Sequence, residues 1–351
     1  MTMSGTPPLS PVQHGGNLHA AIVRYGIPRA DWLDISTGIS PFPWPVPSMP
    51  AEVWQRLPEQ DGALEQAARH YYGTDALAVP GSQWAIQQLP ALFSRRQGNT
   101  RVWLPQECYE EYRYWWQFHG HVLQHYTTLP TQAQLWERDI VIVLNPNNPS
   151  AHYYTVTELQ MLAQQLQVHD GWLILDEAFM DATPEQSLLP HLDADSNANT
   201  NPDTNVILLR SLGKFFGLAG IRTGFVCGNR VVQQELRRVL GPWAISHPAQ
   251  WIAIQALQDA GWQQTMRQFL PAQSRRLANL LARHFPADSI SATPLFATVT
   301  LTPASVTHWQ DQLARQGIWT RCFPQWGKLR FGLADEAGLA RLQRALHHCA
   351  V

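Results

Sequence analysis

The sequence has few charged residues and no pattern typical of a nucleic-acid-binding or membrane protein. Only 15% of its 351 residues are charged, and the formal net charge is -2, so we expect neither a basic surface for nucleic acid nor an acidic tail. The first residues show no positive stretch followed by an apolar core, and no apolar run is long enough to cross a bilayer. We therefore expect no nucleic-acid partner and no membrane partner.

Cysteine is also scarce. The four cysteines, Cys108, Cys227, Cys322 and Cys349, lie far apart in the chain and form no CxxC pair. This spacing favours neither a zinc site nor a framework of disulfides. We expect no metal site, and a reducing cytoplasm is the compartment that fits best.

Short apolar runs alternate with amphipathic segments along most of the chain. Strands are predicted at 77–79, 101–104, 121–126, 140–144, 172–175, 206–209 and 223–227. Helices are predicted at 18–25, 63–72, 85–93, 110–119, 157–168 and 231–240, with Thr157 as the N-cap of the fifth. This alternation favours an α/β fold with a mostly parallel, doubly wound sheet.

The remaining segments indicate how the chain is divided. A smaller α+β part should contain helices over 248–284, strands at 296–301 and 329–333, and a last helix at 337–349. We predict an N-terminal arm (1–45) that packs with this smaller part and the active site, a large domain (46–245) and a small domain (246–351). The polar segment 193–204 has no apolar face and is predicted to be a mobile loop.

Polar residues that can bind a ligand follow several of the predicted strands. In open α/β sheets, ligands bind beyond the carboxyl ends of the strands. Four such groups stand there: Gly81-Ser82-Gln83, the segment 145–149 (NPNNP), Asp176-Glu177, and Ser211 with Lys214 in SLGKFFGLAGIRTG.

Each of these residues also has an ordinary interpretation. Lys214 is either a solvated loop residue or an amine held for covalent chemistry, and Asp176 is either a helix N-cap or the partner of a cationic ring nitrogen. The Gly81 turn is either a plain turn or, with Ser211 and Arg222, an anion site at a helix start. In the same way, NPNNP can be only a stiff turn, and Tyr109 can be core packing.

Together, however, these residues offer what pyridoxal phosphate requires. The set contains an amine for a Schiff base, a carboxylate for the ring nitrogen, an aromatic ring to stack on, an amide for the phenolic oxygen and a site for the phosphate. The set is more specific than any of its members.

The order and separation of three motifs carry a family resemblance. NPNNP, LDEAF and SLGKFFGLAGIRTGF together resemble the fold-type I pyridoxal-phosphate enzymes, in the branch of class I/II aminotransferases that contains the histidinol-phosphate aminotransferases. The match extends from about residue 14 to residue 333. The stretches HGGN and LDISTGISPFPWP further resemble the threonine-phosphate decarboxylases of cobalamin biosynthesis.

The resemblance implies a role for each matching residue. Lys214 would bond the cofactor and serve as the general acid and base. The residues implied in cofactor binding are Asp176 at the ring nitrogen, Asn148 at O3′, Tyr109 stacked on the ring, and Gly81, Ser82, Gln83, Ser211 and Arg222 at the phosphate. The residues implied in substrate binding are Arg330 at the carboxylate, Arg321, His14, Gly16 and Asn17 at the substrate phosphate, and Gly38 beside the carboxylate. For Arg321 and Arg330 the alternative is a surface salt bridge, and for HGGN it is a simple turn.

Three departures from the family pattern stand out. Phe179 replaces a tyrosine that hydrogen-bonds O3′ in many relatives, and Leu57 stands where relatives often have a tyrosine that reaches the cofactor phosphate of the neighbouring subunit. NPNNPTG also becomes NPNNPSA. The first two should alter the affinity or electronics of the cofactor.

The resemblance implies a phosphorylated amino acid as substrate and a homodimer as the assembly. The leading expectation is decarboxylation of L-threonine O-3-phosphate to (R)-1-amino-2-propanol O-2-phosphate and CO2. The alternative is an aminotransferase that acts on histidinol phosphate or a similar compound. A catalytically silent regulatory module is a third and weaker expectation.

Overall fold

The fold is organised around a seven-stranded sheet. The computed structural model describes residues 14–59, 61–192 and 204–349. The strand order is β2-β8-β7-β6-β5-β3-β4, and only β8 runs antiparallel to its neighbours. The strands are β2 (Ala76–Val79), β3 (Arg101–Pro105), β4 (Val122–Tyr126), β5 (Ile140–Leu144), β6 (Trp172–Asp176), β7 (Val206–Ser211) and β8 (Gly224–Gly228). The predicted α/β fold with a mostly parallel sheet is confirmed.

The central strands are apolar throughout because both faces of the sheet are covered. In β5, Val141 and Val143 pack in one core, while Ile140, Ile142 and Leu144 pack in the other. Side chains alternate between the faces of a strand, so a continuous apolar run supplies both cores.

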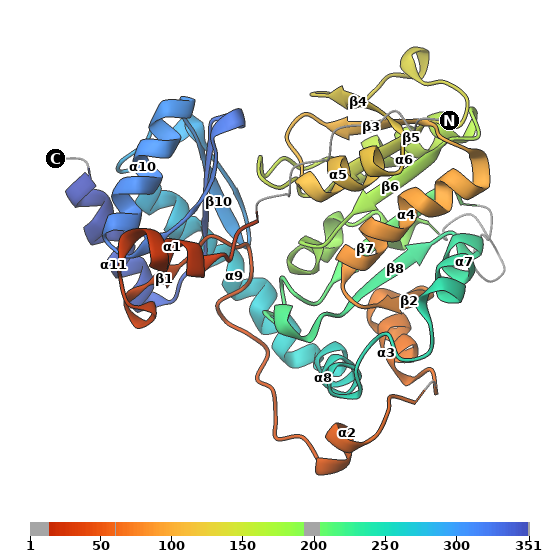
Figure 1. Cartoon of the computed structure of the whole chain (residues 1–351), viewed down its shortest axis with the longest axis horizontal. Coiled ribbons are helices and arrows are strands. Elements are labelled where there is room, and N and C mark those ends of the chain that lie inside the picture. The colour runs from red at the N-terminus through yellow and green to blue at the C-terminus, as the bar shows by residue number, and fades with distance from the viewer. Residues whose placement is uncertain (1–13, 60, 193–203, 350–351) are drawn as a thin grey trace, which may run out of the picture.

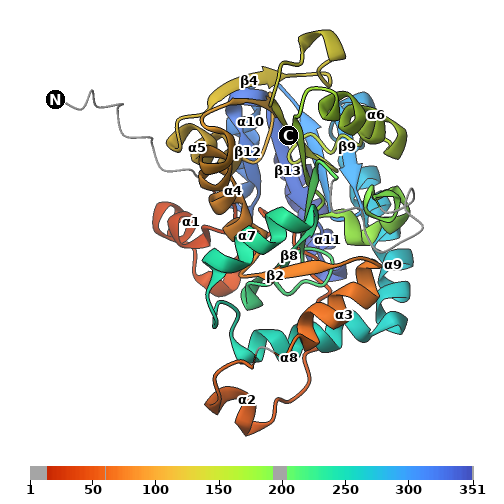
Figure 2. The ribbon, with the colours of Figure 1, turned by 90° about the vertical axis from the view of Figure 1, so that its right-hand side faces the viewer.

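Helices form one layer on each face of this sheet (Figure 1). One core includes residues of α4 (Ser82–Gln97), α5 (Glu110–Phe118) and α7 (Arg230–Leu240). The other includes residues of α3 (Ala63–Tyr72), α6 (Val156–Gln167) and α8 (His247–Gln258). Figure 2 shows α3 and α8 side by side near the lower end of the molecule.

The start of α6 differs from the expectation. Thr155, not Thr157, is the N-cap: its hydroxyl accepts the N–H of Glu158 at 3.2 Å, and the Glu158 carboxylate accepts the N–H of Thr155 at 2.7 Å. This reciprocal capping box stabilises the earlier start, because it satisfies two N–H groups that the helix leaves unpaired.

The C-terminal part is an antiparallel sheet flanked by helices. Its strand order is β12-β13-β10-β9. The elements are α9 (Ala260–Leu281), β9 (Ile290–Thr293), β10 (Phe296–Thr300), α10 (Pro303–Arg315), β12 (Arg321–Phe323), β13 (Lys328–Gly332) and α11 (Glu336–Cys349). The long helix α9 runs from the large sheet to this part of the molecule (Figure 1).

The N-terminal arm joins the C-terminal part through backbone pairing. After α1 (Leu18–Tyr25), the short strand β1 (Leu33–Asp34) pairs in parallel with β11 (Ile318–Trp319). After the arm, the chain continues through α2 (Ala51–Gln55), which projects below the body of the molecule (Figure 1). The division into domains at residues 45 and 245 stays a prediction.

The described residues contain no membrane-spanning helix and no cluster of metal ligands. Within these ranges, no helix is both long and apolar enough to span a membrane, and no three His, Cys, Asp or Glu side chains gather as metal ligands would. The predicted loop at 193–204 lies outside the described residues, apart from Thr204.

Candidate active site

A cavity lies at the carboxyl ends of the parallel strands, where α/β sheets bind ligands. It contains all the residues predicted to bond or bind the cofactor: Gly81, Ser82, Gln83, Tyr109, Asn148, Asp176, Ser211, Lys214 and Arg222. The remaining lining residues are Ile86, Leu144, Pro146, Ala178 and Phe179. The fold therefore brings together residues that are up to 141 positions apart in the sequence, from Gly81 to Arg222.

Lys214 is held in the turn that follows β7. Its carbonyl accepts the N–H groups of Ser40 at 3.0 Å and Gly217 at 3.2 Å, while its amine lies 5.4 Å from the centre of the Phe179 ring. Burial, assisted by the charge of Arg330, lowers the pKa of Lys214 to about 8. A substantial fraction of the amine is therefore neutral just above neutral pH, and the neutral amine is the nucleophilic form.

Asp176 is buried at the end of β6 with two hydrogen-bond donors. The Tyr112 hydroxyl donates to one carboxylate oxygen at 2.8 Å, and the Ala178 N–H donates to the other at 3.0 Å. Burial raises the pKa of Asp176, while these two hydrogen bonds and the Lys214 charge oppose that shift. The carboxylate thus caps a local turn and still faces the cavity, where it can accept a further N–H.

An anion site is formed at the start of α4. Gly81 precedes the helix at φ 78° and supplies no capping side chain, so the first N–H groups of the helix are left for a ligand. A Cβ on Gly81 would lie 2.9 Å from Nη2 of Arg222, and a Cβ on Gly224 would lie 2.5 Å from the Ser82 nitrogen. Glycine at both positions lets Arg222 and the helix start approach each other closely.

Two arginines approach the cavity from the C-terminal sheet. Arg321 and Arg330 pair across the antiparallel strands β12 and β13, so their side chains lie on the same face. Arg330 is buried; its guanidinium donates to Oδ1 of Asn148 and to the Ser36 carbonyl at 2.6 Å. Burial and the charge of Arg321 lower the pKa of Arg330 to about 9, which leaves it cationic at neutral pH.

Arg330 also has an unused donor. Among the described residues, its buried Nε has no hydrogen-bond partner. A buried donor without a partner costs free energy, and a bound carboxylate would satisfy it. The predicted role of Arg330 therefore fits this geometry, although the contact to Asn148 was not foreseen.

The predicted binding residues of the arm contact other parts of the protein. His14 Nε2 lies 2.7 Å from a carboxylate oxygen of Glu111, and the Gly16 N–H donates to the Ser36 hydroxyl at 2.8 Å. Asn17 caps α1 by accepting the N–H of Ala20 at 3.3 Å. None of the three lines the cavity, and their roles toward a substrate stay predictions.

Gly38 is fixed by packing against aromatic rings. A Cβ at this position would lie 2.7 Å from the Phe179 ring and 3.2 Å from the Phe296 ring. Phe296 in turn lies 5.3 Å from the guanidinium of Arg330. The absence of a side chain at Gly38 thus accommodates Phe179, and its role beside a substrate carboxylate stays a prediction.

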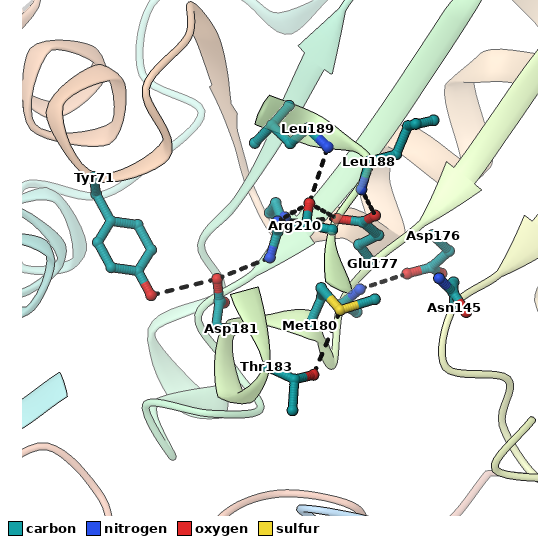
Figure 3. A network of polar contacts seen from close by, with 12 residues as sticks. Tyr71, Asn145, Asp176, Glu177, Met180, Asp181, Thr183, Leu188, Leu189 and Arg210 are labelled. Carbon is teal, nitrogen blue, oxygen red and sulfur yellow. Dashed lines mark hydrogen bonds and ion pairs between the residues drawn. The ribbon is translucent and has the colours of Figure 1, made fainter. Parts of the chain in front are cut away.

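A second group of charges lies beside Asp176 but is closed to the cavity. Figure 3 shows Arg210 between the carboxylates of Glu177 and Asp181, with ion-pair distances of 2.9 and 3.1 Å. Ser187 and the N–H of Leu188 complete the contacts of Glu177. Burial raises the pKa of Glu177, and the Arg210 charge opposes the rise.

Sequence reasoning missed three residues of this region: Tyr112, Glu111 and Ser36. Tyr112 lies in the first turn of α5, three positions after its N-cap Tyr109, and this spacing was the available signal. Nothing in the sequence marks Glu111 or Ser36, because their contacts come from segments that meet only in the fold.

The donor set of the cavity fits pyridoxal phosphate. The start of α4 with Arg222 suits a phosphate, Lys214 suits an aldehyde, and Asp176 suits a protonated ring nitrogen. The space beside Gly81, which a Cβ would fill against Arg222, is a structural feature that the cofactor phosphate would use. No residue of the set conflicts with this cofactor.

Comparison with known proteins agrees with the cofactor that the donor set indicates. The family model of aminotransferase class I and II matches residues 53–346. The chain is 45% identical to the threonine-phosphate decarboxylase of Pseudomonas aeruginosa, over 95% of this chain and 97% of that protein. It is 37% identical to the threonine-phosphate decarboxylase of a Sinorhizobium species, over 96% and 98% of the two chains.

A solved structure shares the fold at low sequence identity. The histidinol-phosphate aminotransferase of Sinorhizobium meliloti, determined in complex with pyridoxal 5′-phosphate, matches with a TM-score of 0.76 and 21% identity. The match covers 99% of each chain.

Proposed function

The chain belongs to the aminotransferase class I and II family, and we propose that it is a pyridoxal-phosphate enzyme that decarboxylates L-threonine O-3-phosphate. The products are CO2 and (R)-1-amino-2-propanol O-2-phosphate. This reaction is a step of cobalamin biosynthesis. One observation carries the proposal: Lys214 and Arg222 line one cavity, and Arg330 donates to Asn148, which belongs to the same lining. This arrangement provides one arginine for a cofactor phosphate and another for an anionic substrate.

The protein residues divide the work of the reaction. When bound, pyridoxal phosphate supplies an electron sink for the electron pair of the bond that breaks at the substrate Cα. Lys214 is the residue that bonds the cofactor and, once released, carries a proton to Cα after CO2 leaves. Asp176 favours the protonated ring nitrogen and thereby strengthens the sink.

Binding residues decide which bond at Cα breaks. Arg330 holds the substrate carboxylate, and Arg321 with His14 holds the substrate phosphate. Guanidinium groups suit both anions because they can donate two parallel hydrogen bonds. Asn148 supplies the amide toward O3′, and Phe179 offers no hydroxyl there, so Asn148 carries that contact alone.

A homodimer in the cytoplasm is the setting that we propose. Trp54, Leu57 and Trp243 are 65%, 63% and 59% exposed, and Trp54 and Leu57 belong to or follow the projecting helix α2 (Figure 1). Such exposed apolar side chains suit an interface. All four cysteines are free, which fits a reducing compartment. Sedimentation analysis of purified protein tests the dimer.

A paired substrate assay tests the reaction. With L-threonine O-3-phosphate and no 2-oxoglutarate, we expect release of one CO2 per substrate consumed. With imidazole-acetol phosphate and glutamate, we expect little or no transamination. If the second pair turns over and the first does not, the protein is an aminotransferase and the proposed reaction is wrong.

A further inference from the structure

Glu111 is a buried carboxylate near the cavity that none of the proposed chemical steps uses. It lies in the first turn of α5 and is only 8% exposed. Its side chain accepts hydrogen bonds from Gln83 Nε2 at 2.6 Å and from Trp115 Nε1 at 2.7 Å, and it pairs with His14 Nε2 at 2.7 Å. Three such contacts hold the carboxylate in a single position.

The contact with Gln83 determines what the Gln83 side chain can do. A carboxylate only accepts hydrogen bonds, so the amide NH2 of Gln83 must face Glu111. The amide oxygen is then turned toward the Tyr109 hydroxyl, which donates to it at 3.0 Å. Both ends of the amide are thereby occupied, and the backbone N–H of Gln83 is the group left for a phosphate.

The same carboxylate holds the arm of the chain. His14 is bound by Glu111 on the large-domain side, while two residues later the Gly16 N–H is bound by Ser36. The Ser36 carbonyl accepts from Arg330. The turn at residues 14–16 therefore spans from α5 to the residue that holds Arg330.

We propose that Glu111 is a positioning residue that fixes the Tyr109 ring through Gln83 and holds His14 beside that ring, with the two ring centres 5.8 Å apart. One carboxylate thus links a residue for the cofactor ring to a residue for the substrate phosphate. The part that concerns His14 rests on the proposed function, whereas the part that concerns Tyr109 requires only that the protein binds pyridoxal phosphate.

Cofactor affinity tests the link to Tyr109 without any substrate. Titration of cofactor-free protein with pyridoxal phosphate, followed by tryptophan fluorescence, should show about tenfold weaker binding for Glu111→Ala, the size expected for a lost charge-assisted hydrogen bond. In a Gln83→Ala background, the same change should weaken binding by less than about twofold, because the effect passes through Gln83.

Glu110→Ala is the matched control. Glu110 precedes Glu111 on the same helical turn but pairs with Arg113, at 3.4 Å and partly exposed. We expect its removal to change cofactor affinity by less than about twofold. Equal effects of the two substitutions, or effects of Glu111→Ala and Gln83→Ala that simply multiply, would overturn the proposal.

Two further measurements keep the test decisive. If Glu111→Ala does not fold, Glu111→Gln preserves the volume and one acceptor and should weaken the cofactor by about threefold. In the assay with threonine phosphate, Glu111→Gln should raise KM more than it lowers kcat, and it should add little to His14→Ala. A protein that binds no pyridoxal phosphate at all refutes the proposed function, whereas unchanged affinity in the Glu111 variants refutes only the positioning role.

Discussion

Two neighbouring sets of charged groups, at the ends of β6 and β7, have opposite surroundings. Asp176 and Glu177 are adjacent in sequence, as are Arg210 and Ser211. On one face of the sheet, Arg210 forms ion pairs with both Glu177 and Asp181 in a buried cluster (Figure 3). On the other face, Asp176 and Ser211 open to the cavity that contains Lys214.

The difference shows how one pair of strands serves both stability and chemistry. Alternation along a strand sends adjacent side chains to opposite faces. The Arg210 cluster supplies its own counter-charges. Among the described residues, one hydroxyl and one N–H donate hydrogen bonds to Asp176, and the pKa of Lys214 is lowered. The Arg210 cluster pairs its charges within the protein, although Nε of Arg210 and Oδ2 of Asp181 have no hydrogen-bond partner among the described residues, and the cavity offers groups that a ligand can bind.

The largest expected effect is on activity, when Lys214 in the cavity is replaced. Lys214→Ala should lower activity by about 10³-fold or more, because it removes both the covalent attachment and the proton carrier. Reduction with borohydride followed by mass spectrometry should locate the cofactor on Lys214 in the wild type. The chain has only one other lysine, Lys328, so Lys328→Ala is the matched control and should keep the adduct.

In the cluster of Arg210, Glu177 and Asp181, we expect a large effect on the stability of the fold. Arg210→Met leaves two buried carboxylates without their cation, which should reduce the free energy of unfolding by about 3–5 kcal/mol. Arg237→Met, which breaks an exposed pair with Glu65 at 3.3 Å, should cost less than about 1 kcal/mol. Urea unfolding of the cofactor-free proteins measures both. A small loss for Arg210→Met would show that the cluster is not a structural element.

The depressed pKa of Lys214 should make the stability of the cofactor-free protein depend on pH. The folded-state pKa of Lys214, about 8, lies below its ordinary value of 10.5. Above pH 10.5 the amine is neutral in both the folded and the unfolded state. As the pH falls from 10.5 to 8, the unfolded state takes up a proton that the folded state does not, so the free energy of unfolding decreases by roughly 3 kcal/mol. Cofactor-free Lys214→Met should be more stable than wild type at pH 7, and this advantage should shrink toward pH 10. An advantage that does not change with pH contradicts the depressed pKa.

Much of the fold could be predicted because apolar runs and strand ends are local signals. The seven strands of the large sheet follow from runs such as 140–144, and most polar residues of the cavity end those strands or lie within four residues after them. The short strands β1, β9, β11 and β12 were not predicted, since two to four residues carry little periodicity. β1 and β11 pair over 285 positions, from Leu33 to Ile318, whereas β9 and β12 pair with the neighbouring strands β10 and β13.

The site was predictable where a residue follows a strand and less so where it lies on a helix or the arm. Asp176 is the last residue of β6, Lys214 stands three residues after β7 and Asn148 four residues after β5, and all three line the cavity. Tyr112 and Glu111 act from α5, and their partners Asp176 and His14 are 64 and 97 positions away. Such contacts are decided by packing, which the sequence pattern does not specify.

Thermal unfolding of two adjacent variants, with and without pyridoxal phosphate, tests the contrast most directly. Glu177→Gln should lower the midpoint of the cofactor-free protein by roughly 10 °C and preserve the rise on adding cofactor. Asp176→Asn should leave the cofactor-free midpoint within about 2 °C of wild type and reduce that rise. The reverse pattern, with the cofactor response lost in Glu177→Gln and the fold weakened in Asp176→Asn, would contradict the account.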